Sequence, residues 1–235
     1  MKKDHRNTHN IILIIPLLLC LHLQPVFAGS GSTQNPAEQM RFQDIAHWVN
    51  VFEDPERDKW QKPDEVVRKM MIGRTDIVAD IGAGTGYFTR LFAAAAPEGR
   101  AIGLDVEESM IRYMEEDAKK RGLKNYTARV VKTDDPQMEM KSVDIIFLCN
   151  TYHHIEDRVS YFRRAAESLK DGGRLIIVDF YKKELPYGPP PSHKLAQEVV
   201  ISELQEAGYR LRTSQQFLPY QYYLEFDIRK HGLNW

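Results

Sequence analysis

The sequence has few cysteines, no excess of charge of either sign and no grouped metal ligands. Its 235 residues include 2 cysteines, which excludes the disulfide framework of small secreted domains and a cysteine-rich zinc site. The formal net charge is -1 and no basic run is interleaved with aromatic residues, so nothing indicates nucleic-acid binding. Histidines and acidic residues do not occur at metal-ligand spacing, and we therefore predict no metal site.

An apolar run that comfortably spans a membrane is also missing. Ile11–Leu23 comes nearest, but it is short for a membrane helix. Basic residues precede it, and Val26 and Ala28 follow in the small-x-small pattern that signal peptidase reads. We therefore predict a signal peptide over residues 1–28 and an exported protein, periplasmic or secreted, without stable membrane insertion. An uncleaved N-terminal membrane anchor is the alternative. Cleavage leaves one cysteine, Cys149, in an apolar run typical of a buried core.

The chain does have the length for one domain with a substantial core, preceded by a helical extension. A helix is expected over residues 35–52, because Asn35 can cap it and apolar residues recur on one face. An irregular link is expected over 53–61, followed by a short helix that Pro63 starts and Gly73 ends. We assign residues 29–76 to an N-terminal helical cap and residues 77–235 to the main domain.

From Ile77 onward, short apolar segments alternate with amphipathic ones. Strands are expected at residues 77–81, 100–105, 126–131, 143–150, 173–180, 209–214 and 220–228. Helices are expected at 87–96, before Gly122, after a cap at Asp157, and between a cap at Ser192 and Gly208. This alternation predicts an α/β fold, with a Rossmann-like, mostly parallel sheet and helices on both faces. Ligands of such sheets bind at the carboxyl ends of the strands.

The first strand runs into three glycines in the stretch IVADIGAGTGYF. Glycine tolerates positive φ and lets a ligand approach the backbone. The spacing of Gly82, Gly84 and Gly86 differs from the dinucleotide fingerprint, and Asp80 would repel a pyrophosphate but suit an ammonium group. Asp105 ends the second strand, where an acid commonly holds ribose hydroxyls. Together these residues ask for a nucleoside with a cationic, amino-acid-like tail, which describes S-adenosylmethionine.

At this point the chain resembles the class I S-adenosylmethionine-dependent methyltransferases. The segments that carry the resemblance are VADIGAGTG, GLDVEESM, TDDP, LCNTYHHIED and SLKDGGRLIIVDF, in the order of the family's motifs. It extends from roughly Trp60 to Phe226 and implies a seven-stranded sheet whose last strand is antiparallel. The segments RDKWQKPDEVV and LPYQYYLEF resemble a subgroup of small-molecule-type enzymes. A small-molecule methyl acceptor is therefore expected.

The resemblance also implies roles for individual residues. Asp80 contacts the amino group of the cofactor's methionine part, the glycines make room for the cofactor, and Asp105 binds the ribose. Met110 packs against adenine or lies in the core, and Asp134, with Asp135 as the alternative, receives the adenine amino group. Cys149 and Asn150 end the fourth strand beside the cofactor. Trp60 and Gln61 form a lid over it.

Methyl transfer from a sulfonium requires alignment of the acceptor and exclusion of water, so a general base is optional. The weak candidates are Tyr152, His153 and His154, which follow the fourth strand, and at most one of the two histidines is expected to contact substrate. His193 is interpreted as a surface residue. A non-catalytic cofactor-binding or scaffold protein of this fold is the alternative function. A nicotinamide-dependent oxidoreductase is disfavoured by the glycine spacing and by Asp80.

Overall fold

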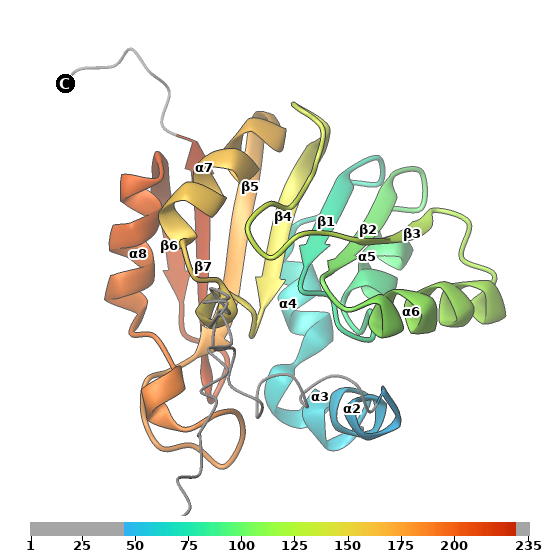
Figure 1. Cartoon of the computed structure of the whole chain (residues 1–235), viewed down its shortest axis with the longest axis horizontal. Helices are drawn as coiled ribbons and strands as arrows, with labels where there is room; N and C mark the ends of the chain where they lie inside the picture. Colours follow the sequence, from blue (N-terminus) through green and yellow to red (C-terminus); the bar gives the residue numbers. More distant parts are fainter. Residues whose placement is uncertain (1–44, 229–235) are drawn as a thin grey trace, which may run out of the picture. The chain divides into compact units, whose positions relative to one another are not determined.

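The computed structural model describes residues 45–228 (Figure 1). The predicted signal peptide and the beginning of the first expected helix lie outside these residues. The helical cap begins with α2 (Ile45–Phe52), α3 (Glu56–Gln61) and α4 (Pro63–Met70). Within the described residues, no helix is both long and apolar enough to cross a membrane.

Two predictions about the cap are wrong. The expected irregular link contains α3, whose first turn carries Glu56 and Asp58 at the positive end of the helix. The following helix ends not at Gly73 but at Met71, which has a φ of 47° and donates its N–H to the Arg68 carbonyl. Gly73 instead lies in a turn, where its N–H bonds to Asp76 Oδ2 at 2.8 Å.

The domain is built on a seven-stranded sheet with the order β3-β2-β1-β4-β5-β7-β6. The strands are β1 (Ile77–Ile81), β2 (Arg100–Asp105), β3 (Tyr126–Val130), β4 (Val143–Cys149), β5 (Leu169–Phe180), β6 (Tyr209–Gln215) and β7 (Gln221–Ile228). The pairings among β1 to β5 are parallel, whereas β7 is antiparallel to both of its neighbours. The predicted fold, with an antiparallel last strand, is confirmed.

The helices of the domain are α5 (Thr89–Ala95), α6 (Glu108–Arg121), α7 (Arg158–Ser168) and α8 (Gln197–Glu206). One core cluster joins the sheet to residues of α4 and α5, and the other joins it to α7 and α8. As predicted, α6 stops at Gly122, and Asp157 caps α7 by accepting the Ser160 N–H. Helices therefore cover both faces of the sheet.

The predicted start of α8 is wrong. Ser192 lies in a short 3₁₀ turn, Pro191–His193, and the chain extends again at Lys194 before α8 begins after Ala196. In the helix that results, Val200 is fully buried and Val199 is 42% exposed. His193 is exposed, in agreement with its interpretation as a surface residue.

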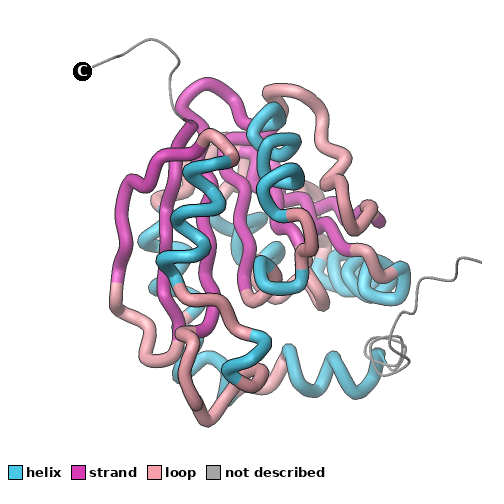
Figure 2. Tube along the Cα trace, turned by 60° about the vertical axis from the view of Figure 1, so that its left-hand side comes forward, coloured by secondary structure: helices cyan, strands magenta, loops and turns pink. Residues whose placement is uncertain are grey.

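Two segments lie at the edge of the sheet where the parallel strands end. Figures 1 and 2 both show α2 and α3 on one side of this edge and the segment 181–196 on the other. We call this edge the carboxyl edge. The sequence places the glycines, Asp80 and Asp105 here, so the carboxyl edge is the candidate site.

Candidate functional site

The glycine loop between β1 and α5 has its predicted left-handed backbone. The φ angles of Gly82, Gly84 and Gly86 are 68°, 57° and 77°. A Cβ at Gly82 would lie 2.3 Å from Thr151 Cγ2, and one at Gly86 would lie 2.2 Å from the Tyr126 hydroxyl. Two of the three glycines therefore make room for the protein's own side chains, in addition to any space they give a ligand.

Asp105 organises this loop from the neighbouring strand. Its Oδ2 accepts the Gly84 N–H at 2.8 Å, and its Oδ1 accepts the Glu107 N–H at 3.0 Å. Burial raises the pKa of the carboxyl, and these backbone N–H groups oppose the shift. A carboxylate has about four lone-pair positions. The two bonds to the backbone leave acceptor capacity for the hydroxyls of a ribose.

Asp80 is the second buried acid of the loop, only 3% exposed. Its Oδ2 accepts the Thr89 hydroxyl at 2.6 Å. Burial raises its pKa to about 7, the Thr89 bond opposes this rise, and the charge of Asp105 adds to it. No lysine or arginine among residues 45–228 forms an ion pair with Asp80. Its ionised form would therefore gain from a cationic ligand group.

Apolar surface adjoins Asp105 at the same edge. Val106 and Val130 are 44% and 41% exposed, and Asp105 pairs with Val130 between β2 and β3. Exposed apolar side chains at this edge suit the face of an aromatic base. The two carboxylates and this surface fit a nucleoside with a cationic tail.

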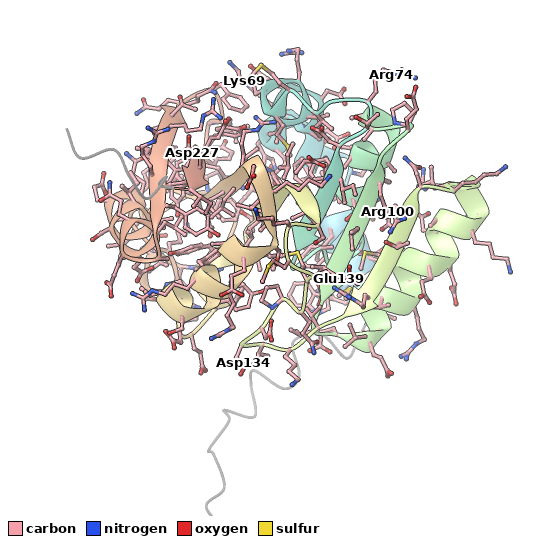
Figure 3. All side chains as sticks on the ribbon, turned by 90° about the horizontal axis from the view of Figure 1, so that it is seen from above. Lys69, Arg74, Arg100, Asp134, Glu139 and Asp227 are labelled. Carbon is pink, nitrogen blue, oxygen red and sulfur yellow. The ribbon has the colours of Figure 1, made fainter. Side chains whose placement is uncertain are left out.

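The other three residues expected around adenine differ from one another in burial and in their contacts. Met110 is 1% exposed on α6, within the interior. Asp134 is exposed, its carbonyl accepts a hydrogen bond from Arg164, and Figure 3 shows it at the periphery of the molecule. The carboxylate of Asp135 accepts the Gln137 N–H at 2.8 Å. The roles of all three stay predictions.

A chain of buried amides ties the cap to the carboxyl edge. Gln61 of α3 donates to Gln221 of β7 at 2.6 Å, and Gln221 donates to Asn150 Oδ1 at 2.7 Å. Both glutamines are 0% exposed. Asn150 follows β4 with a φ of 57°. Cys149 Sγ lies 3.6 Å from Gln61 Oε1, and burial raises the pKa of this thiol to about 12.

Arg57 contacts Gln61, the first amide of this hydrogen-bonded series, and was not predicted from the sequence. Its Nε and Nη2 both lie 3.4 Å from Gln61 Oε1, and its Nη1 donates to the Phe52 carbonyl at 2.9 Å. The guanidinium carbon lies 4.0 Å from the centre of the Tyr87 ring, next to the glycine loop. The signal for Arg57 is its place one helical turn before Gln61, on the face that meets the sheet.

Trp60 packs against aromatic residues of the chain. Its ring stacks on Tyr187 with centroids 5.1 Å apart, and Phe180 and Tyr220 lie 5.7 and 6.3 Å away. These contacts join α3 to the segment 181–196. The structure thus shows Trp60 linking α3 to the segment 181–196 at the carboxyl edge. Its stacking on the cofactor stays a prediction.

The candidate catalytic residues separate clearly in the structure. Tyr152 is 0% exposed and donates to Glu203 Oε2 at 2.9 Å, and burial raises its pKa. His154 is exposed, with its ring centroid 4.2 Å from that of His153. His153 Nδ1 lies 2.9 Å from Asp179 Oδ2, and their side chains are 3% and 2% exposed. The structure therefore sets His153 apart as an imidazole oriented by a buried carboxylate.

Asp179 was missed as an individual residue, although it belongs to the segment SLKDGGRLIIVDF. Its position directly before Phe180, at the carboxyl end of a buried strand, was the available signal. Its Oδ1 also accepts its neighbour's backbone N–H, from Phe180, at 2.8 Å. Across the part of the chain that the structure describes, no group of three His, Cys, Asp or Glu side chains could hold a metal ion.

Comparisons with known proteins agree with this geometry. A family model described as a methyltransferase domain matches residues 73–219. Aklanonic acid methyltransferase DauC of Streptomyces sp. (strain C5) is 29% identical over 134 residues, 55% of this chain and 60% of that protein. Trans-aconitate 2-methyltransferase of Afipia carboxidovorans is 31% identical over 126 residues, 52% of this chain and 43% of that protein. These matches span only part of each relative's length.

A solved structure covers more of the chain. The crystal structure of an S-adenosylmethionine-dependent methyltransferase from Aquifex aeolicus has a TM-score of 0.73 and 25% sequence identity. The match covers 79% of this chain and 99% of that one. The structural similarity therefore extends over most of the chain.

Proposed function

The chain belongs to the class I S-adenosylmethionine-dependent methyltransferases, and we propose that it transfers the methyl group of this cofactor to a small molecule. One observation carries the proposal: two buried carboxylates, Asp80 and Asp105, flank the left-handed glycine loop, and Gly84 joins the loop to Asp105. The names of two relatives contain small molecules, aklanonic acid and trans-aconitate, which supports an acceptor of this size.

The residues at the carboxyl edge would divide the work of binding. Asp105 would accept hydrogen bonds from the ribose, Val106 and Val130 would pack on adenine, and Asp80 would hold the ammonium group of the tail. When bound, the cofactor supplies a methyl group already activated on a sulfonium. The protein then has to align the acceptor and exclude water.

His153 and Asp179 provide a proton acceptor for that reaction. Because the Asp179 carboxylate faces Nδ1, the proton of a neutral His153 resides on Nδ1 and Nε2 is left as the basic nitrogen. No hydrogen bond from Nε2 occurs among the described residues. His153 would take a proton from the acceptor atom as it attacks the methyl group. The aromatic contacts of Trp60 with Tyr187 would keep the edge covered meanwhile.

A turnover assay tests the function. The protein is incubated with S-adenosylmethionine and a panel of small carboxylic acids, phenols, alcohols and amines, and formation of S-adenosylhomocysteine is measured. His153→Gln and Asp179→Asn should lower turnover at least tenfold with unchanged cofactor affinity, whereas His154→Gln, an exposed neighbour, should change it little. Cofactor binding without turnover across the panel would favour the scaffold alternative. A thermal shift with NAD instead of S-adenosylmethionine would favour the oxidoreductase.

Export is a separate proposal that rests on the sequence pattern of residues 1–28. Expression with detection in the periplasmic or secreted fraction, followed by mass spectrometry, should find an N-terminus at Gly29. Recovery of Met1 from the membrane fraction would favour the uncleaved anchor.

A further inference from the structure

His153 lies in a 3₁₀ turn of three residues, Tyr152–His154, which we call the His153 turn. The N–H groups of His154 and Ile155 donate to carbonyls of this turn and of the residue before it, at 2.9 and 3.3 Å, and the second bond is long. A single helical turn is not stable in water through its own hydrogen bonds. Side chains from other elements must therefore fix the turn and, with it, the direction of the imidazole.

Tyr152 fixes the beginning of the His153 turn. Its ring stacks on Phe162 of α7 with centroids 5.0 Å apart, and its side chain is fully buried. Its hydroxyl donates to Glu203 Oε2 of α8 at 2.9 Å. The residue directly before His153 is thus held by packing and by a hydrogen bond to a carboxylate.

Arg158, at the start of α7, fixes the other end of the turn. Its Nη1 donates to the carbonyl of Ile155, the residue that follows the turn, at 2.8 Å. Its Nε and Nη2 donate to the two carboxylate oxygens of Glu203 at 2.7 and 2.8 Å, the bidentate geometry that fixes orientation as well as charge. The side chains of Arg158 and Glu203 are only 20% and 22% exposed, so this is not a loose surface pair.

Glu203 is therefore the group on which both ends of the His153 turn depend. Burial opposes ionisation of this carboxyl, but the hydrogen bonds from Arg158 and Tyr152 outweigh it, and its pKa lies below the ordinary value. Glu203 is accordingly charged at neutral pH. A charged carboxylate can accept from the guanidinium and the phenol at once, because it has about four lone-pair positions.

The Asp179 carboxylate can orient the imidazole only if the turn presents the ring to it. We propose that Glu203 is a positioning residue for His153: through Tyr152 and Arg158 it keeps Nδ1 against Asp179 and leaves Nε2 to take the acceptor's proton. The chemical use of Nε2 rests on the proposed function, whereas the position of the ring is a property of the protein without ligands.

The two carboxylates that act on His153 lie on either side of the segment 181–196 in the chain. β5 ends directly after Asp179, and α8, which carries Glu203, begins at Gln197. The segment at the carboxyl edge is thus attached at both of its ends to residues that hold the imidazole. Such attachment matters because a misplacement of about 1 Å in a reacting group can cost on the order of a hundredfold in rate.

NMR of the cofactor-free protein with 15N-labelled histidine tests the position of the ring. At about pH 8, where an imidazole is generally neutral, the 15N shifts distinguish a proton on Nδ1 from one on Nε2. The spectrum of His153→Gln identifies the signals of His153. The wild-type protein should show one tautomer, with the proton on Nδ1. Glu203→Gln should move both ring signals toward a mixture of the two tautomers, because one amide oxygen cannot serve Arg158 and Tyr152 together.

Arg163→Gln is the matched control. Helices α7 and α8 lie side by side (Figure 1), and Arg163 joins them through Glu206 at 3.7 Å, with both side chains more than half exposed. This second pair connects the same helices without a contact to the His153 turn. Its loss should leave the signals of His153 unchanged.

Kinetics test the consequence for the reaction. In the turnover assay described above, Glu203→Gln should lower kcat about tenfold or more and change the KM for S-adenosylmethionine less than about twofold, because only the base is displaced. Tyr152→Phe removes one hydroxyl and keeps the ring against Phe162, so it should fold and should show a smaller loss of kcat with a smaller shift of the ring signals.

A general loss of stability is the competing explanation, since Glu203→Gln leaves the guanidinium of Arg158 without its ion-pair partner. The pair variant Arg158→Met with Glu203→Met replaces both charges by apolar side chains, a change that is often neutral for stability. It should keep a thermal midpoint near that of the wild-type protein and still show the tautomer mixture.

The outcomes separate the positioning role from the proposed function. A single Nδ1–H tautomer in both Glu203→Gln and the pair variant would overturn the positioning role, whatever their thermal midpoints. A tautomer mixture in these variants, combined with no turnover by the wild-type protein, would support the positioning of His153 and overturn its use as a base.

Discussion

The two halves of the carboxyl edge are built in different ways. In the half formed by β1, β2 and β3, the contacts join residues close in sequence: Asp80 and Thr89 are 9 residues apart, and Gly84 and Asp105 are 21 apart. In the half formed by β4, β5 and β7, Gln61 bonds to a residue 160 positions away, Gln221, which bonds to Asn150 across 71 positions. The first half depends on the shape of one loop, and the second depends on the complete fold.

Because of this difference, the two halves of the carboxyl edge should be disrupted by different kinds of mutation. A loop held by left-handed glycines fails when a side chain is added, because backbone geometry and space are both restricted. A set of side chains assembled from distant segments fails when one partner is removed, because the others are left buried and unpaired.

The largest effect is expected at Gly82. Gly82→Ala places a Cβ 2.3 Å from Thr151 Cγ2 at a φ of 68°, so strain and overlap should together lower the free energy of unfolding by about 3 kcal/mol or more. Gly122→Ala is the control, because Gly122 has a φ of 69° and nothing within 4 Å of the added atom. It should cost about 1 kcal/mol. Urea unfolding measures both, and equal losses would show that the overlap with Thr151 is relieved by small shifts.

A smaller effect, about 2 kcal/mol, is expected from Gln221→Leu. This change leaves the Gln61 amide and Asn150 Oδ1 without their partner in a buried environment. The double variant Gln61→Leu with Gln221→Leu should cost less than the sum of the single changes, since it removes both members of the pair. Gln205→Leu, at an exposed position on α8, is the control. Additive losses in unfolding experiments would mean that the two glutamines act independently.

The smallest effect, about 1.4 kcal/mol per pH unit, is expected from protonation of Asp80. Its pKa of about 7 means that the carboxyl must lose a proton to meet an ammonium group, so S-adenosylmethionine affinity should fall up to about tenfold per unit below pH 7. Asp80→Asn should flatten this dependence in calorimetry between pH 5.5 and 8.5. A slope that persists in the variant would assign the titration to another group.

The groups that face Asp80 set this dependence. They are the Thr89 hydroxyl, the Tyr126 phenol, the Asp105 carboxyl and the Arg57 guanidinium. The same raised pKa affects stability without ligand, since the folded protein binds this proton more tightly than the unfolded chain does. The stabilisation is complete below the ordinary value of 3.8 and is lost as the pH rises to about 7.

The two halves also differ in how much of them the sequence predicts. The glycines, Asp80 and Asp105 form a continuous pattern because their partners lie within one strand-helix-strand unit, and the structure places them together as expected. Arg57 lies on a helix that the sequence did not predict, and Asp179 meets His153 only when β4 and β5 pair. The roles of the motif residues toward the cofactor are still predictions.

The accuracy of the secondary-structure prediction also differs between parts of the molecule. The strands were predicted to within one residue at each end except β5, which begins at Leu169, four residues before its expected start. The other errors lie in the cap and in the segment that leads into α8. Helix α3 has almost no apolar periodicity of its own, and its fully buried side chain, Gln61, is polar. Ser192 carries a good capping side chain, but the buried Lys194 holds the chain extended beyond it.

The direction of β7 also decides when the site is completed during synthesis. An antiparallel strand starts at the edge where its neighbours end, so Gln221, the first residue of β7, arrives beside Phe180, the last residue of β5. On the ribosome, the glycine loop and Asp105 emerge while Gln61 still lacks its partner. The half built around the glycine loop can therefore form early, and the cap is secured only after the final strand has been translated and inserted.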